Sequence, residues 1–387
     1  MKLETFDLYR VNLPLVSPFR TSFGTQTVKD ALIVRASTDL GEGWGECVAM
    51  SEPLYSSEYL DAAEHVIEQH LAPRLFAAAD LKPHHVAPTL DQVRGHRMAK
   101  ASLEMALMDA ELRLAGISLA SFLGGVREEV DCGVSIGIQE NTAKLLDLVQ
   151  GYLDEGYRRI KLKIEPGSDL VPVRAVREKF PDILLQVDAN SAYTHSDAHH
   201  LARLDAFDLL LIEQPFPEED IRSHATLAQI AKTPICLDES IVSAQVAADA
   251  IAWGACSIIN IKAGRVGGYL EARRIHDVCA ANGVPVWCGG MLETGLGRAA
   301  NVALASLPNF TLPGDTSASD RYFAQDLTEP FALQDGRLRV PTRPGLGVDP
   351  IPEVLAEVTV GRKTLSRAAR SSKGIEQRGV RENRSWV

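Results

Sequence analysis

Hydrophobic residues in the middle of the chain come in short runs that alternate with amphipathic helical patterns. From about Val130 onward, seven runs rich in Val, Ile and Leu recur: Cys132–Ile138, Arg159–Ile164, Ile183–Val187, Leu209–Ile212, Ile235–Leu237, Cys256–Ile261 and Val284–Trp287. Helical patterns lie between them, for example Thr142–Asp154, Ala225–Lys232 and Gly268–Ala281. Runs this apolar predict strands buried on both faces, as in a parallel sheet covered by helices.

The number of strand–helix units indicates how the sheet closes. Seven or eight units follow one another here, and a complete (β/α)₈ barrel needs roughly 200–250 residues. The pattern therefore predicts an α/β fold with a closed (β/α) barrel. A doubly wound open sheet is the alternative that the same pattern leaves open.

The residues before the barrel have a different pattern. Phe6–Leu13, Ala31–Ser37 and Gly43–Val48 read as extended segments, and residues 38–43 have the Asp and Gly content of a hairpin loop. Helical patterns follow at Glu58–Phe76 and Arg97–Ala115. We predict an N-terminal domain of strands and helices at residues 1–125 and the barrel at 126–318.

Two predictions concern the C-terminal part. Residues 319–359 contain a turn and the Pro/Gly-rich stretch PTRPGLGVDPIP, and we expect this segment to return to the N-terminal domain. Residues 360–387 carry eight Lys or Arg against two Glu and few large apolar side chains, which predicts a disordered basic tail. A polyanion-binding tail is the functional alternative.

Composition limits the class of protein. The 387 residues are 45% hydrophobic and 24% charged, and the net charge of −11 argues against nucleic acid or an anionic membrane as a partner. We find no signal peptide and no apolar run long enough to span a membrane. The six scattered cysteines lack a CxxC pair, which indicates reduced, buried thiols and a cytoplasmic location.

Charged residues end five successive predicted strands. These are Lys163, Asp188, Glu213, Asp238 and Lys262, at intervals of 25, 25, 25 and 24 residues. Because each interval is one strand–helix unit, the five side chains should share one rim of the barrel, the rim where substrates bind.

The three acids predict a metal site. Carboxylates that converge at an apolar strand end repel one another, and a divalent cation removes that repulsion. Oxygen ligands without His or Cys favour a hard ion, Mg²⁺ first and Mn²⁺ next. Asp188, Glu213 and Asp238 are the expected ligands. The alternative is that such acids cap helices or form ion pairs at the rim.

The two lysines predict proton transfer. Lys163 lies one strand before the acids and Lys262 one strand after them, so the two amines should face each other across a bound substrate. A lysine at a cation-rich, desolvated site has a lowered pKa and can act as a base. Lys161 points the same way as Lys163 by strand alternation. A phosphate-binding or Schiff-base role for one lysine is the alternative.

Further polar residues could support this site. Asn190 lies on the side of Asp188, and Glu239 follows a proposed ligand, so both could orient ligands by hydrogen bonds. The stretch 289–298 begins with two glycines, which allow close approach of the backbone to a bound molecule.

These residues resemble the enolase superfamily and its muconate-lactonizing-enzyme subgroup. The resemblance rests on Lys161-Leu162-Lys163, on the three acids and on Lys262. Stretches such as PFRTSFGTQ, GEGWGECVAM, LIEQPF, CLDESI and WCGGMLETGLGR are similar to the N-succinylamino acid racemase/o-succinylbenzoate synthase group. At the end of the eighth strand, residues 312–317 lack the DxD motif of dipeptide epimerases.

The resemblance implies a set of properties for this chain. The N-terminal domain would be an α+β capping domain, with loops around Phe19–Gly24 and Met50 that close over the barrel. The chain would form a homo-oligomer. A small carboxylate substrate would contact Ser135, Lys161, Asn190, Gly290, Met291 and Leu292. Its α-proton would be removed through an enediolate, giving racemisation of an N-acylamino acid, dehydration to o-succinylbenzoate in menaquinone synthesis, or both. The alternatives are another cycloisomerase-like reaction, an acid-sugar dehydratase, or a catalytically silent barrel that only binds.

Overall fold

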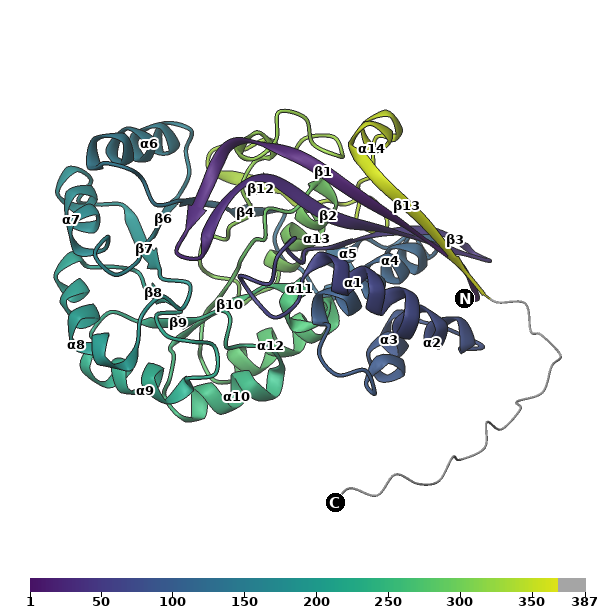
Figure 1. Ribbon diagram of the computed structural model, residues 1–387, viewed down its shortest axis with the longest axis horizontal. Coiled ribbons are helices and arrows are strands. Elements are labelled where there is room, and N and C mark those ends of the chain that lie inside the picture. The colour runs from purple at the N-terminus through teal and green to yellow at the C-terminus, as the bar shows by residue number, and fades with distance from the viewer. Residues whose placement is uncertain (368–387) are drawn as a thin grey trace, which may run out of the picture.

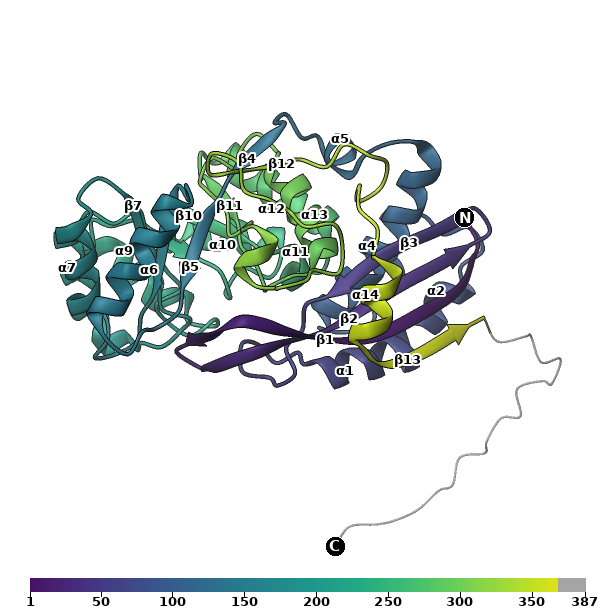
Figure 2. The same cartoon turned by 90° about the horizontal axis from the view of Figure 1, so that it is seen from above.

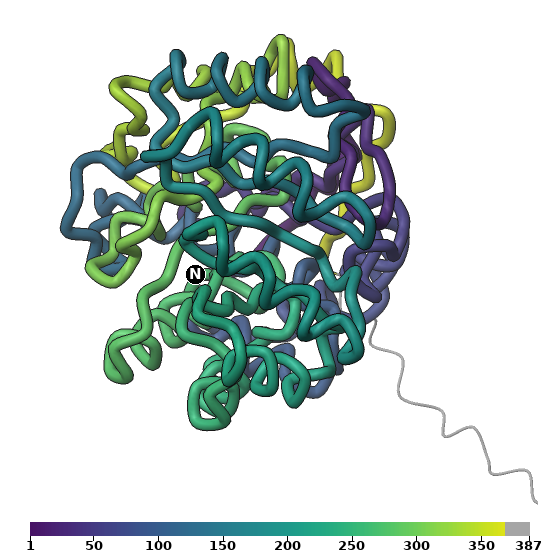
Figure 3. The backbone as a smooth tube through the Cα atoms, turned by 90° about the vertical axis from the view of Figure 1, so that its left-hand side faces the viewer, coloured from purple at the N-terminus to yellow at the C-terminus, as the bar shows by residue number. Residues whose placement is uncertain are grey.

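Seven parallel strands form a curled sheet in which each strand pairs with the next one along the chain. The computed structural model describes residues 1–367. The strands are β5 (Gly133–Ile136), β6 (Arg159–Lys163), β7 (Leu184–Asp188), β8 (Ile212–Glu213), β9 (Ile235–Leu237), β10 (Ile258–Ile261) and β11 (Val286–Cys288). Helices cover the outside: α6 (Thr142–Asp154), α7 (Leu170–Lys179), α8 (Ala198–Leu201), α9 (Ile221–Ile230), α10 (Ala244–Ala252), α11 (Ala263–Val266), α12 (Tyr269–Ala281) and α13 (Gly295–Ala305) (Figures 1 and 3).

An irregular eighth segment closes the sheet into a barrel. Phe310 forms a parallel bridge with Val286 of β11, and Gly314 forms one with Cys132, next to β5. The amide of Gly133 donates to the carbonyl of Gly314 at 2.7 Å, and the amide of Asp315 donates to that of Cys288 at 2.8 Å. The barrel prediction is therefore confirmed, and the open-sheet alternative is wrong.

A second, antiparallel sheet lies beside the barrel, with the order β13-β1-β2-β3. Its strands are β1 (Leu3–Thr21), β2 (Gly24–Thr38), β3 (Gly41–Cys47) and β13 (Thr359–Ser366). Residues alternate along β2: Leu32 and Val34 pack in one core with the N-terminal helices, whereas Ala31 and Ile33 join the core of the barrel. We call this sheet and its helices the capping domain (Figure 2).

The helices of the capping domain are short except for one. They are α1 (Leu60–Val66), the π-helical turn η1 (Ile67–Leu71), α2 (Ala72–Ala77), α3 (Pro83–Leu90) and α4 (Arg97–Ala115). α4 is buried on nearly every side because it lies between the capping sheet and the barrel. Gly43 and Gly45 of β3 allow this packing, since a Cβ at either position would collide with the backbone of α4.

The connections and the C-terminal segment complete the described chain. α5 (Leu119–Leu123) and β4 (Glu129–Asp131) lead into the barrel, and β12 (Arg337–Arg339) pairs with β4. Short 3₁₀ turns occur at η2 (His195–Asp197), η3 (Ala202–Phe207) and η4 (Ser319–Arg321). After α14 (Pro352–Val358), β13 pairs with β1.

The structure differs from the sequence prediction at several points. Residues 360–366 were expected in a disordered tail but form most of β13, because their backbone pairs with β1. The rest of the predicted tail, 368–387, lies outside the described residues. The helix predicted at Glu58–Phe76 is broken into α1, η1 and α2, and the strand predicted at Leu209–Ile212 is only Ile212–Glu213. The boundaries 125/126 and 318/319 remain predictions, and the boundary 359/360 falls inside β13.

Two general features concern the whole described part of the chain. All six cysteines are buried and free, so the predicted disulfide-free framework holds. None of the helices within residues 1–367 is long and apolar enough to cross a bilayer.

Candidate active site

The five charged residues at the strand ends lie on one rim of the barrel. Lys163, Asp188 and Glu213 are the last residues of β6, β7 and β8, and Asp238 and Lys262 directly follow β9 and β10. Lys163 is level with Asp188, and Asp188 is level with Glu213, in the strand register. Because all these strands are parallel, their carboxyl ends meet at the same edge.

Each lysine of the predicted site pairs with the acids. The amine of Lys163 donates to Asp188 Oδ2 at 2.6 Å, and that of Lys262 donates to Asp238 Oδ2 at 2.7 Å. The amine of Lys161 lies 3.2 Å from Asp188 Oδ2 and 3.1 Å from Glu213 Oε2. Lys163 and Lys262 therefore contact the acids at opposite ends of the row, with Lys161 between them.

Burial and mutual repulsion shift the acids in different directions. Burial and the neighbouring Asp188 raise the pKa of Glu213 to about 8. Burial also raises that of Asp188, but the charges of Lys163 and Lys161 outweigh it and hold the pKa below its usual range. Burial and Asp238 raise the pKa of Glu239 to about 8. The lysines therefore hold Asp188 in its charged form, whereas Glu213 and Glu239 keep their protons more readily.

The expected lowering of a lysine pKa is wrong for Lys262 in this arrangement. Burial lowers its pKa, but the carboxylate of Asp238 raises it by more, so that the pKa stands well above the usual value. The same holds for Lys161, because Asp315, Glu213 and Asp188 outweigh the effect of burial. The sequence argument assumed neighbouring positive charge, whereas the contacts here are with acids.

The residues expected to support the acids do contact them. The backbone amide of Asn190 donates to Asp188 Oδ1 at 3.0 Å. The side-chain oxygen of Asn190 accepts from the amine of Lys163 at 2.6 Å. The Asn190 amide group also donates to Glu239 Oε1 at 2.9 Å. Asn190 has a positive φ of 42°, so its backbone is strained where it meets the site.

The predicted substrate contacts line one cavity above the acids. Its wall includes the six predicted residues, both predicted catalytic lysines and side chains of the capping domain: Ser135, Lys161, Asn190, Gly290, Met291, Leu292, Lys163, Lys262, Phe19, Phe23, Met50 and Tyr55. The hydroxyl of Ser135 is buried and has no hydrogen-bond partner within residues 1–367. The capping domain supplies Phe19, Phe23, Met50 and Tyr55, and the barrel supplies the charged residues together with Met291 and Leu292.

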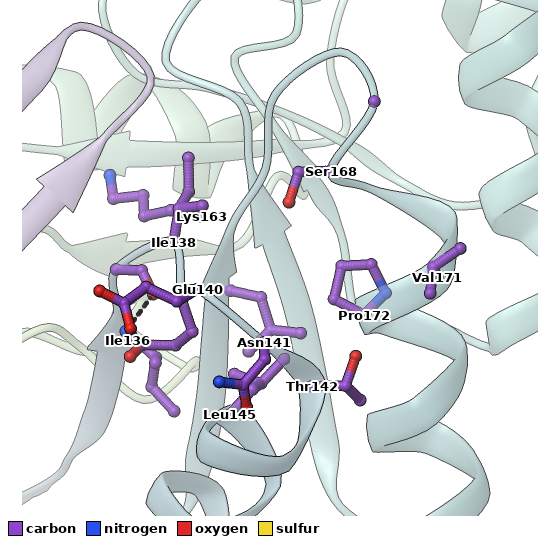
Figure 4. A pocket seen from close by; sticks show the side chains of 14 residues that line it. Ile136, Ile138, Glu140, Asn141, Thr142, Leu145, Lys163, Ser168, Val171 and Pro172 are labelled. Carbon is purple, nitrogen blue, oxygen red and sulfur yellow. Dashed lines mark hydrogen bonds between the residues drawn. The ribbon is translucent and has the colours of Figure 1, made fainter.

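A second cavity, of about 270 Å³, adjoins the site at Lys163. It lies between the loops that follow β5 and β6, and Glu140, Asn141, Ser168 and Pro172 are among its lining residues (Figure 4). The amine end of Lys163 points away from Asn141 in this view. Lys163 therefore borders free space on both sides.

Sequence reasoning missed several residues that contact this cluster. Asp315 Oδ2 lies 2.6 Å from the amine of Lys161. Tyr55 accepts a hydrogen bond from Lys262 at 3.0 Å, and Asn260 donates one to Glu213 at 2.7 Å. Asp315 could have been predicted from the spacing of the strand ends. Gly289 lies 27 residues after Lys262, and Asp315 lies 26 residues after Gly289, so both follow nearly the same interval. Tyr55 lies in a capping loop, which no periodic pattern marks.

The donor atoms fit a hard divalent cation, although the acids are not gathered around a common point. Within the described residues, no group of three or more His, Cys, Asp or Glu side chains is close enough to hold a metal ion. The acid oxygens are turned to lysine amines instead. Asp238 Oδ1 is buried without a hydrogen bond and forms an ion pair at 2.9 Å with Arg265, while Lys262 pairs with the other oxygen of Asp238. Carboxylate oxygens at three adjacent strand ends are the ligand chemistry of Mg²⁺ and Mn²⁺.

Comparisons with known proteins agree with this geometry. Residues 144–354 match the family model "Enolase C-terminal domain-like". Residues 5–124 match the N-terminal domain of the mandelate racemase / muconate lactonizing enzyme family. The chain belongs to this family of enzymes. The predicted resemblance to the enolase superfamily is thus confirmed.

Individual relatives show which members of the family this chain is similar to. The chain is 67% identical to an N-succinylamino acid racemase from Amycolatopsis sp., across 94% of this chain and 99% of the relative. It is 48% identical to an o-succinylbenzoate synthase from Geobacillus kaustophilus, across 90% of this chain and 94% of the relative. A crystal structure of an enolase superfamily member from Listeria innocua superposes with a TM-score of 0.91 at 43% identity, covering 95% of this chain and all of that one.

Proposed function

We propose that this chain uses Mg²⁺, or Mn²⁺ in its place, to remove and return the proton at the α-carbon of a carboxylate substrate. The reaction is racemisation of an N-succinylamino acid or a related N-acylamino acid, dehydration to o-succinylbenzoate, or both. The observation that carries the proposal is the position of Lys163 and Lys262, which line one cavity and hydrogen-bond to acids at opposite ends of the row. The names of the similar racemase and synthase support the substrate class.

The acids would hold the cation, which supplies positive charge to the substrate carboxylate as the α-proton leaves. Asp188, Glu213 and Asp238 are the proposed ligands. In the structure, the amines of Lys161, Lys163 and Lys262 occupy these oxygens. With these oxygens holding a cation, the three amines would be free to contact the substrate.

Racemisation then needs one lysine amine that is neutral and one that is protonated. The neutral amine of one lysine takes the proton from one face of the α-carbon, and the ammonium of the other gives a proton to the opposite face. Both lysines end in the exchanged protonation states, so the proton count balances. Lys161 would hold an oxygen of the carboxylate. In dehydration, Lys163 would act on one face as base and then as acid, while the charge of Lys262 stabilises the enediolate.

The proposal is tested by exchange of the α-proton for deuterium. D- and L-N-succinylphenylalanine are incubated in D₂O with Mg²⁺, in parallel with the dehydration substrate. We expect exchange of both enantiomers, loss of exchange with chelator and recovery when Mg²⁺ is added back. If both enantiomers keep their protons, the racemase assignment fails. Exchange of a single enantiomer, together with dehydration, would assign the protein to o-succinylbenzoate synthesis instead.

A further inference from the structure

The loop between β11 and α13, residues 289–294, forms the wall of the cavity next to Lys262. Its residues Gly290, Met291 and Leu292 line the cavity. A Cβ added to Gly289 would come within 2.7 Å of Cε of Lys262. The backbone at Gly289 therefore packs directly against the methylene chain of Lys262.

The loop is strained and needs outside support. Leu292 has a φ of +54°, in the left-handed region that residues with a side chain rarely adopt. That conformation is unfavourable for a residue other than glycine. Leu292 is nearly buried, so its environment holds it there.

Two charged side chains of the capping sheet supply that support. The amine of Lys29, in β2, is buried and donates to the carbonyl oxygen of Met291 at 2.9 Å. Glu46, in β3, accepts from the amide and the hydroxyl of Thr294 at 3.1 and 2.7 Å, and from the amide of Gly297 at 3.0 Å. One residue thus holds the middle of the loop, and the other holds its junction with α13.

Stability alone does not explain this pair. Burying a charged side chain is costly, and well-packed apolar residues of similar volume are often at least as stabilising. Burial raises the pKa of Glu46 to about 7, and the charge of Lys29 opposes that shift, so the two groups act on each other. Their hydrogen bonds end on a loop that lines the site and touches Lys262.

We propose that Lys29 and Glu46 are positioning residues, which hold the 289–294 loop against Lys262 and so set the rate of proton transfer on the Lys262 face of the substrate. The inference rests on the proposed function. It assigns to the capping domain a direct effect on one of the two faces, in addition to covering the cavity.

The test is the Lys29→Met variant, which keeps the length of the side chain and removes the amine. With Mg²⁺ present, deuterium exchange is measured for each enantiomer separately. We expect exchange to slow by roughly 10- to 100-fold for the enantiomer whose exchange Lys262→Ala abolishes, because small displacements of a catalytic group have effects of this size. The other enantiomer should exchange at the wild-type rate.

Two further variants complete the design. Glu46→Gln keeps one oxygen that can accept from Thr294, and we expect the same selectivity with a smaller effect. Arg35→Met is the matched control: Arg35 lies six residues further along β2 and pairs with Asp7, so its loss perturbs the same sheet without touching the loop. Both enantiomers should exchange normally in this control.

The possible outcomes separate the inference from the proposed function. Equal slowing of both enantiomers in Lys29→Met, or no slowing, overturns the inference while the proposed function stands. If the wild-type protein exchanges neither enantiomer, the proposed function fails and the inference fails with it. Slowing of deuterium exchange on the Lys262 face alone supports both the inference and the proposed function.

Discussion

The two sides of the barrel mouth differ in how the capping domain reaches them. On the Lys163 side, the contacts come from the tip of the β1–β2 hairpin. The carbonyl of Arg20 accepts from the amide of Ile138 at 3.0 Å, and the hydroxyl of Ser22 donates to the carbonyl of Ala189 at 3.2 Å. The side chain of Arg20 forms an ion pair at the surface with Glu165 at 3.1 Å. Surface contacts of this kind contribute little to stability.

On the Lys262 side, the capping domain contributes buried polar groups. Tyr55 contacts Lys262 directly, and Glu46 caps α13, the helix that follows the adjoining loop. Glu104 of α4 accepts from the amide of Leu270 at 3.1 Å, at the start of α12. Two amines at equivalent positions of the strand pattern therefore have unequal surroundings. Lys163 is held by contacts within the barrel, whereas Lys262 is held by contacts with both the barrel and the capping domain.

Removing either lysine should give the largest effect. Lys163→Ala and Lys262→Ala should each abolish exchange of one enantiomer, with a loss of roughly 10²- to 10⁴-fold, because each removes the only base on its face. The measurement is the deuterium exchange rate of D- and L-N-succinylphenylalanine. Lys144→Ala, an exposed lysine of α6, is the control. Loss of the same enantiomer in both variants would contradict the two-faced site.

Asp315→Asn should not distinguish the Lys163 side from the Lys262 side, since Asp315 pairs with Lys161, which lies between these two lysines. Asp315 pairs with Lys161 at 2.6 Å and with the buried Arg159 at 2.9 Å. Removing the carboxylate leaves two buried cations short of a partner, so we expect the free energy of unfolding to fall by about 3–5 kcal/mol. Urea unfolding gives this value, and the exposed Asp320→Asn serves as the control. A stability like that of the wild type would show that Arg159 and Lys161 do not depend on Asp315.

Glu104→Gln should change the pH dependence of stability. Burial raises the folded pKa of Glu104 to about 7, above the ordinary 4.5, so the folded protein holds this proton more tightly than the unfolded chain does. Stability from this group is present at low pH and is lost as the pH rises from about 5 to 8, by at most about 3 kcal/mol. The variant should therefore gain stability relative to wild type over that range. Unfolding curves at several pH values measure it, and parallel pH profiles would be the contrary result.

Tyr55→Phe should give the smallest effect and the clearest difference between the two sides. The hydroxyl accepts from Lys262 and donates to Asp238 Oδ2 at 3.2 Å. Its loss should slow exchange on the Lys262 face by about 10-fold, the equivalent of one charge-assisted hydrogen bond, and leave the Lys163 face unchanged. Tyr59→Phe, an exposed tyrosine of the same region, is the control. Equal slowing on both faces would contradict the asymmetry.

The sequence predicted the barrel and the row of strand-end charges because both follow from periodicity. An apolar run places its last residue on the rim, so Asp188 and Lys262 could be located by counting. The pairing of β13 could not be predicted, since residues 360–366 look polar and find their partner in β1, more than 340 residues away. Tyr55, Lys29 and Glu46 were missed for the same reason: their roles come from contacts between distant segments. The argument about the lysine pKa failed because it assumed positive charge around Lys262, whereas the carboxylate of Asp238 contacts this lysine.

The most direct test of the account is a crystal structure with Mg²⁺ and a slowly reacting N-succinylamino acid bound. We expect Asp188, Glu213 and Asp238 to have turned from the lysines onto a single ion. The α-carbon should then lie between the amines of Lys163 and Lys262, one on each face. An ion bound elsewhere, or both amines on the same face of the α-carbon, would contradict it.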